Sequence, residues 1–160
     1  MNRVKSVILL TLLSVILMAI GGAFGGRSGA FTMLLVSFGI NFITYWNCDK
    51  IVLAQYDAKY VSPQDVPELY DLVGKLCQNA KIPMPKLYVI PTDVPNAFAT
   101  GRNVNHAAVA ITEGLLSRLN KDELAGVISH ELSHIRHHDT LIMTLAASIA
   151  SAIGYIAQTA

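Results

Sequence analysis

Two long apolar runs near the N-terminus restrict the fold of this chain more than any other feature. Residues 7–24 and residues 30–46 contain no acidic or basic side chain, and only the link Gly25–Gly29 separates them. About 20 apolar residues are enough for a helix to cross the hydrocarbon core of a bilayer. The pattern therefore predicts a transmembrane helical hairpin over residues 1–47.

A secretory signal peptide is the alternative interpretation of the first run, since Arg3 and Lys5 precede it and small residues lie near its end. The second run favours the hairpin. Tyr45 and Trp46 close that run at the level where aromatic side chains gather in membrane proteins. The polar Asn41 within it is expected to bond a neighbouring helix.

The basic residues predict an orientation for the hairpin. Arg3 and Lys5 precede the first run, Lys50 and Lys59 follow the second, and only Arg27 lies in the link. Basic residues are enriched in cytoplasmic segments of membrane proteins. The N-terminus and everything after the second run are therefore expected on the cytoplasmic side of a multi-pass membrane protein.

The overall composition agrees with a membrane protein. The chain is 52% hydrophobic and 14% charged, whereas an average soluble domain carries about a quarter charged residues. A net charge of +1 gives no basic field for nucleic acid, so no nucleic-acid partner is predicted. Cys48 and Cys77 form no CxxC pair, which favours a reducing compartment.

A third apolar run occupies residues 140–160 and extends to the last residue. Its small residues Ala146, Ala150 and Gly154 recur at every fourth position, which suits close helix packing in a bilayer. The run predicts a third transmembrane helix, although a buried helix of a soluble core would look similar. Because no polar tail follows, we expect the sequence to be truncated here.

The polar residues 48–139 predict a water-facing domain, so the expected fold class is mainly α with a small β-hairpin or sheet. An amphipathic helix is expected from Pro63 to Ala80, with Ser62 or Asp65 as its N-cap. Alternating apolar residues and intervening turn residues predict short strands and a hairpin. The predicted strands cover residues 86–90, 96–100 and 107–112, the predicted hairpin covers 96–112, and a short helix covers 113–119.

A capped amphipathic helix is predicted from Lys121 to His138. Asn120 followed three residues later by Glu123 is an N-cap signature. The helix carries an apolar stripe that would face a core. The stripe consists of Leu124, Val127, Ile128, Leu132 and Ile135.

Three polar residues on this helix predict a metal site. His130 and His134 are one helical turn apart, so both imidazoles can reach one Zn²⁺ ion. Glu131 is expected to act as the catalytic base, accepting a proton from water and passing it to the leaving amine of a peptide. His137 is a less favoured ligand, and Asp139 is expected either to orient a ligand histidine or to cap a helix or face solvent.

Several longer motifs resemble those of the HtpX-like membrane zinc endopeptidases, relatives of the CAAX prenyl proteases. The matching residues are Asn96-Ala-Phe-Ala-Thr-Gly101, Val109-Ala-Ile-Thr-Glu-Gly-Leu-Leu116, Glu123-Leu-Ala-Gly-Val-Ile-Ser-His-Glu-Leu-Ser-His134 and Asp139-Thr140. The N-terminal hairpin and Asp49–Leu53 also look like this family. The resemblance implies a zincin-like (gluzincin) half-domain with one zinc ion, bound by His130 and His134, and Glu131 as base.

The resemblance further implies a stress-related enzyme of the cell inner membrane that cuts misfolded or damaged membrane proteins. It implies that residues 96–112 line the cleft, where a strand edge could pair with an extended substrate; we expect proline at Val109 or Ala110 to disturb this pairing. The family's third ligand is a glutamate that this chain lacks, because no acidic residue follows Asp139. The alternative is a truncated, inactive membrane protein with a residual metal-binding or client-binding site.

Overall fold

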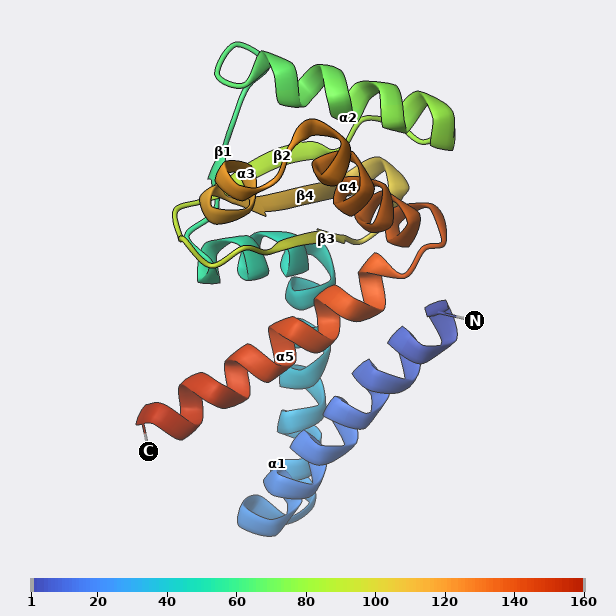
Figure 1. Cartoon of the computed structure of the whole chain (residues 1–160). Coiled ribbons are helices and arrows are strands. Elements are labelled where there is room, and N and C mark those ends of the chain that lie inside the picture. The colour runs from blue at the N-terminus through green and yellow to red at the C-terminus, as the bar shows by residue number, and fades with distance from the viewer. Residues whose placement is uncertain (1, 160) are drawn as a thin grey trace.

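The computed structural model places a small mixed α/β unit at one end of a set of long apolar helices (Figure 1). It describes the backbone of residues 2–159 and the side chains of residues 4–150 and 158. The elements are α1 (Asn2–Gln55), β1 (Lys59–Tyr60), α2 (Pro67–Ala80), β2 (Lys86–Ile90), β3 (Ala97–Gly101), the 3-10 helix η1 (Val104–His106), β4 (Ala107–Thr112), α3 (Glu113–Arg118), α4 (Lys121–Arg136) and α5 (Thr140–Thr159). The mainly helical class with a small sheet is confirmed.

Helix α1 turns back on itself at Gly26, which has φ 59° and ψ −146°. This conformation is open to glycine because glycine has no Cβ to clash with the backbone. The two halves of α1 then lie alongside each other (Figure 1). Asn41 joins them, since its Nδ2 donates to the Ser14 hydroxyl at 2.8 Å and to the Leu10 carbonyl at 3.3 Å.

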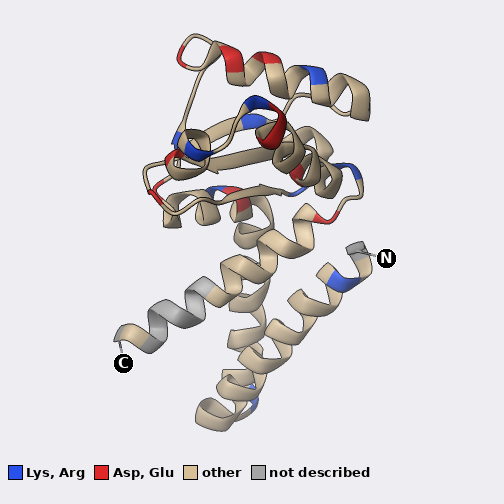
Figure 2. Cartoon of the chain, viewed as in Figure 1, with Lys and Arg blue, Asp and Glu red and all other residues tan. Residues whose placement is uncertain are grey.

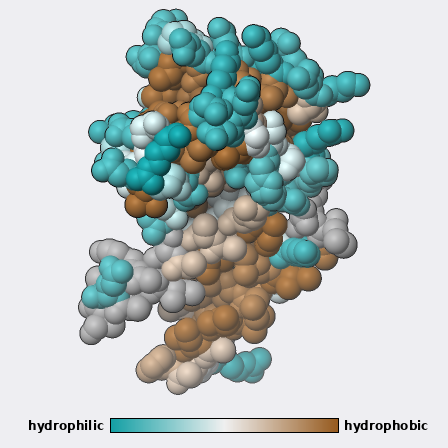
Figure 3. Space-filling model, viewed as in Figure 1, coloured by the Kyte–Doolittle hydropathy of each residue, from teal (hydrophilic) through white to brown (hydrophobic). Residues whose placement is uncertain are grey.

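The surface of α1 is apolar over most of its length. Residues 4–55 form the one helix, in the part of the chain with described side chains, that is long and apolar enough to cross a membrane. The described part of α5, Thr140–Ala150, is a shorter apolar helix. Most of the charged residues lie in the α/β unit (Figure 2), and the helices below it present a largely hydrophobic surface (Figure 3).

The second half of α1 continues beyond the predicted apolar run. That run ends at residue 46, whereas the helix extends to Gln55. The expected start of the polar domain at residue 48 therefore lies inside α1. The last turns carry Val52 and Leu53, which are 4% and 5% exposed. The end of α1 is thus part of the packing of the α/β unit.

The sheet has the strand order β1-β2-β4-β3. The predicted hairpin is confirmed, because β3 pairs antiparallel with β4 in a register that sets Ala99 opposite Val109. Strands β2 and β4 have the predicted bounds, and β3 is shifted by one residue. The short strand β1 and the parallel pairing of β2 with β4 were not predicted. Strand β3 is an edge of the sheet.

Strand β4 is buried on both faces of the sheet. Its Val109 and Ile111 belong to a core with α2, α3 and α4, and this core also contains Ile128 and Leu132. Its alanines 108 and 110 face the other way, toward Leu53 of α1. Small side chains on this second face allow α1 to approach the sheet closely.

Helix α2 begins four residues later than predicted. The Ser62 amide and hydroxyl both donate to Asp65 Oδ2, at 2.8 and 2.7 Å, and these bonds lower the pKa of the Asp65 carboxyl. Residues 62–65 therefore form a turn, and neither Ser62 nor Asp65 caps the helix. Pro67 starts it, because proline fits the first helical position and forces the preceding residue out of the helical region.

Helix α4 begins as predicted. Asn120 Oδ1 accepts from the Glu123 amide at 2.9 Å, and Glu123 Oε2 accepts from the Asn120 amide at 3.0 Å. The helix ends at Arg136, two residues before the predicted His138. His138 has φ 59°, a left-handed conformation that cannot continue a right-handed helix.

Candidate metal centre

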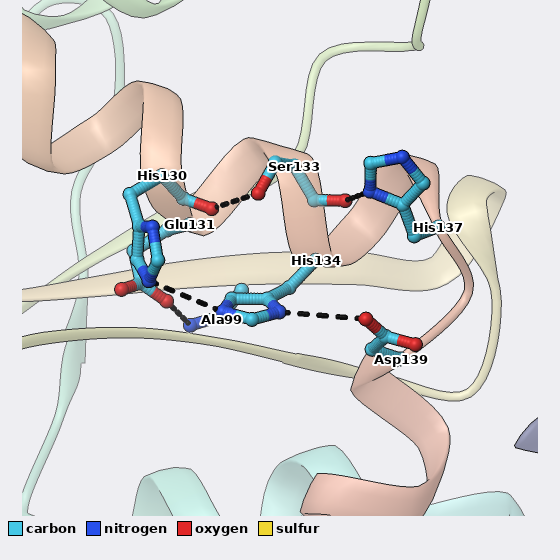
Figure 4. Close-up of polar contacts among 7 residues, drawn as sticks. All are labelled: Ala99, His130, Glu131, Ser133, His134, His137 and Asp139. Atoms are coloured by element: carbon cyan, nitrogen blue, oxygen red, sulfur yellow. Dashed lines mark hydrogen bonds and ion pairs between the residues drawn. The ribbon is translucent and has the colours of Figure 1, made fainter.

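His130 and His134 point toward the same place from successive turns of α4 (Figure 4). Their Nε2 atoms are 3.3 Å apart, and their rings are nearly perpendicular. His130 is exposed and His134 is partly exposed. Buried Ile128, Leu132 and Ile135 hold the helix against the core, which leaves the two imidazoles on its accessible side.

The separation of these two nitrogens fits a zinc ion. In a tetrahedral site with Zn–N distances of about 2.05 Å, two ligand nitrogens lie about 3.3–3.4 Å apart. The Nε2 to Nε2 distance of 3.3 Å matches this edge. His130 and His134 would therefore hold zinc without moving apart, and imidazole nitrogen is a common zinc ligand in proteins.

Glu131 lies beside His130 but faces the sheet. The residue is 9% exposed, and its Oε2 accepts a hydrogen bond from the Ala99 amide at 3.1 Å (Figure 4). A buried carboxylate needs such a donor, because its desolvation is otherwise costly. The edge strand β3 therefore fixes the carboxylate next to the histidine pair.

Two further polar residues lie near the pair. Asp139 Oδ2 is 3.6 Å from Nδ1 of His134, on the side of the ring away from His130. His137 faces elsewhere, because its Nδ1 lies 2.7 Å from the Ser133 carbonyl oxygen. Among the residues with described side chains, no group of three or more His, Cys, Asp or Glu is arranged to hold a metal ion.

The outer edge of β3 is partly covered by neighbouring helices. The Gly101 amide donates to Thr144 Oγ1 of α5 at 3.2 Å, and Thr100 and Thr144 hydroxyls are 2.9 Å apart. Thr144 lies in none of the motifs noted in the sequence. Ala99 lies in the Asn96–Gly101 motif, but the contact of its amide with Glu131 joins segments far apart in the chain, so no local pattern predicts it.

The expectation that proline at Val109 or Ala110 would disturb substrate pairing at a strand edge is corrected by the sheet order. Both residues lie on β4, which has β2 on one side and β3 on the other. Their backbone groups are already used by neighbouring strands, and both residues are fully buried. Only β3 offers a sheet edge next to α4.

Comparison with known proteins places the chain in a family. Residues 63–160 match peptidase family M48. A "Protease HtpX homolog" of Desulfatibacillum aliphaticivorans is 51% identical over 159 residues, covering 99% of this chain and 51% of the relative. A second, from Thermodesulfovibrio yellowstonii, is 49% identical over 160 residues, covering 100% of this chain and 57% of the relative. The chain thus spans about half the length of these relatives.

The fold also resembles a solved structure. The crystal structure of S. mikatae Ste24p superposes with a TM-score of 0.55 over 95% of this chain and 37% of that one. Sequence identity is 16%, so this likeness concerns the fold alone. The family match and the similarity to HtpX homologs agree with the motifs in the sequence, and the chain belongs to peptidase family M48.

Proposed function

We propose that this chain is part of a membrane-bound, zinc-dependent endopeptidase. The observation that carries this proposal is the pair of imidazole nitrogens, 3.3 Å apart, at the separation that one zinc ion requires. The apolar helix α1 supports attachment to a bilayer. Membership of family M48 supports peptide hydrolysis.

His130 and His134 would hold the zinc ion, and a glutamate outside these 160 residues is proposed as the third protein ligand. When bound, zinc supplies a Lewis acid and lowers the pKa of an attacking water. Glu131 would act as general base: its carboxylate would accept a proton from the attacking water and deliver it to the leaving amine. The Ala99 amide keeps the carboxylate oriented for this transfer.

The proposed substrates are misfolded or damaged membrane proteins, cut on the cytoplasmic side of the cell inner membrane as part of a stress response. An unfolded segment can adopt the extended form that pairs with a sheet edge. Strand β3 is such an edge and lies against Glu131. The basic residues flanking the apolar runs support the proposed orientation.

Glu131→Gln in the full-length protein tests the proposal. The substitution keeps the side-chain shape but removes the base, so proteolysis should fall by about 100-fold or more while zinc content stays unchanged. Zinc content would be measured by atomic absorption and cleavage with an unfolded protein substrate. Wild-type cleavage by the Gln variant would exclude Glu131 as the base.

A second candidate is a membrane protein that binds metal or client segments without cleaving them. It is favoured by the donor set, because the described residues bring two metal ligands together rather than three. Adding His130→Ala and His134→Ala to the zinc measurement separates the two. If the wild type binds zinc but does not cleave, and the two alanine variants lose the zinc, the results would support this second candidate.

A further inference from the structure

The turn between α4 and α5 returns the chain to the metal site. Helix α4 ends at Arg136, and the left-handed His138 reverses the direction of the backbone. The Asp139 amide then donates to the His134 carbonyl at 3.0 Å. Asp139 thereby lies beside the last turn of α4, with its carboxylate directed at the His134 ring (Figure 4).

Helix α5 fixes Asp139 from the other side. The Met143 amide donates to the Asp139 carbonyl at 3.2 Å, which makes Asp139 the N-cap residue of α5. The backbone of Asp139 is thus held by both helices at once. The position of the Asp139 carboxylate relative to His134 is therefore set by the turn.

The two ring nitrogens of His134 have different neighbours. Nε2 faces His130 Nε2 at 3.3 Å, and Nδ1 faces Asp139 Oδ2 at 3.6 Å. A carboxylate next to one imidazole nitrogen favours the proton on that nitrogen, which leaves the other nitrogen with a free lone pair.

We propose that Asp139 is a positioning residue that keeps the proton of His134 on Nδ1 and directs the Nε2 lone pair at the metal position. The inference rests on the proposed metal site for its functional meaning. Asp139 contacts neither metal nor substrate in this role. It orients a ligand, and a carboxylate of this kind typically changes metal affinity by about 10- to 100-fold.

The test must separate this role from capping of α5. Ser is about as good an N-cap as Asp, but its shorter side chain cannot reach His134 Nδ1. Asp139→Ser therefore keeps the cap and removes the contact. Asp139→Asn keeps the cap and an oxygen that can accept from Nδ1–H. Asp122→Ser, in the exposed first turn of the same α4, is the matched control.

The experiment uses the full-length protein in detergent micelles, with Zn²⁺ titration and ¹⁵N spectra of the metal-free histidines. We expect a protonated Nδ1 on His134 in the wild type, and zinc affinity about 10- to 100-fold lower in Asp139→Ser. Asp139→Asn should recover part of that loss, and Asp122→Ser should bind like the wild type.

Wild-type zinc affinity and an unchanged His134 spectrum in Asp139→Ser would overturn the inference. Failure of the full-length wild-type protein to bind zinc would instead contradict the proposed function. The ¹⁵N spectra of the metal-free proteins would still decide where the His134 proton lies. The two failures are therefore distinguishable.

Discussion

At the scale of single residues, a buried carboxylate and a left-handed backbone conformation each cost free energy. Glu131 places a carboxylate where it is 9% exposed, and the Ala99 amide supplies the donor. His138 holds a left-handed backbone conformation, which is unfavourable for residues with a Cβ. Glu131 follows His130 on α4, and His138 lies in the turn that follows the same helix.

The conformation of His138 leads to a prediction about stability. His138→Val places a β-branched residue at positive φ, and we expect a loss of about 1–2 kcal/mol in the free energy of unfolding. His138→Gly is the matched variant, since glycine accepts this conformation, and it should be at least as stable as the wild type. Denaturant titration in detergent micelles measures both. Equal loss in the two variants would contradict the role of the backbone conformation.

At the scale of elements, the proposed pairing of a substrate with the edge strand β3 leads to a prediction. In an antiparallel pair, a residue whose amide points away from its partner strand also points its carbonyl away. The Ala99 and Gly101 amides point away from β4, because they donate to Glu131 and Thr144. With these amides occupied, a pairing substrate would donate its own N–H groups to carbonyl oxygens of β3.

Peptides methylated on backbone nitrogen test this pairing in the full-length enzyme. Only every second N–H of an extended substrate faces β3. Methylation of that set should abolish measurable cleavage, whereas methylation of the alternate set should leave most of it. Cleavage rates would be followed by mass spectrometry on two peptides of the same sequence. Equal cleavage of both peptides would rule out pairing with β3.

At the scale of the whole molecule, contacts between distant segments attach the α/β unit to the apolar helices. Arg102, just after β3, stacks on Trp46 of α1 with its guanidinium carbon 4.3 Å from the ring centre. Its Nη1 also donates to the Trp46 carbonyl at 3.3 Å. Thr144 of α5 meets Thr100 and the Gly101 amide in a buried contact. Strand β3 is therefore held by both α1 and α5.

The Thr144 contact gives a prediction for the attachment of α5. Thr144→Val keeps the side-chain shape but leaves the Gly101 amide and the Thr100 hydroxyl without this partner, which should lower stability by about 1–3 kcal/mol. Thr144→Ser retains the hydroxyl and should lose less. Thermal unfolding in detergent, followed by circular dichroism, compares the two variants. A valine variant as stable as the serine variant would show that the hydroxyl contributes nothing.

Short-range patterns in the sequence predicted much of the local structure. The strands at residues 86–90 and 107–112 and the Asn120–Glu123 capping box depend on neighbouring residues, so the sequence predicts them well. The helical spacing of His130 and His134 likewise brings their nitrogens together. The start of α2 was wrong by four residues, because the Ser62–Asp65 turn competed with a helical cap.

The sequence by itself indicated the apolar helices and the pairing of His130 with His134, because helical periodicity and residue spacing act over a few turns of chain. Its longer motifs indicated the family. Only the tertiary structure decided which strand forms the sheet edge, which amide holds Glu131, and that Asp139 faces His134. The pattern of residues within one segment does not indicate which other segment it will contact. These contacts depend on which apolar surfaces are buried together, and this packing is determined by all the elements of the chain.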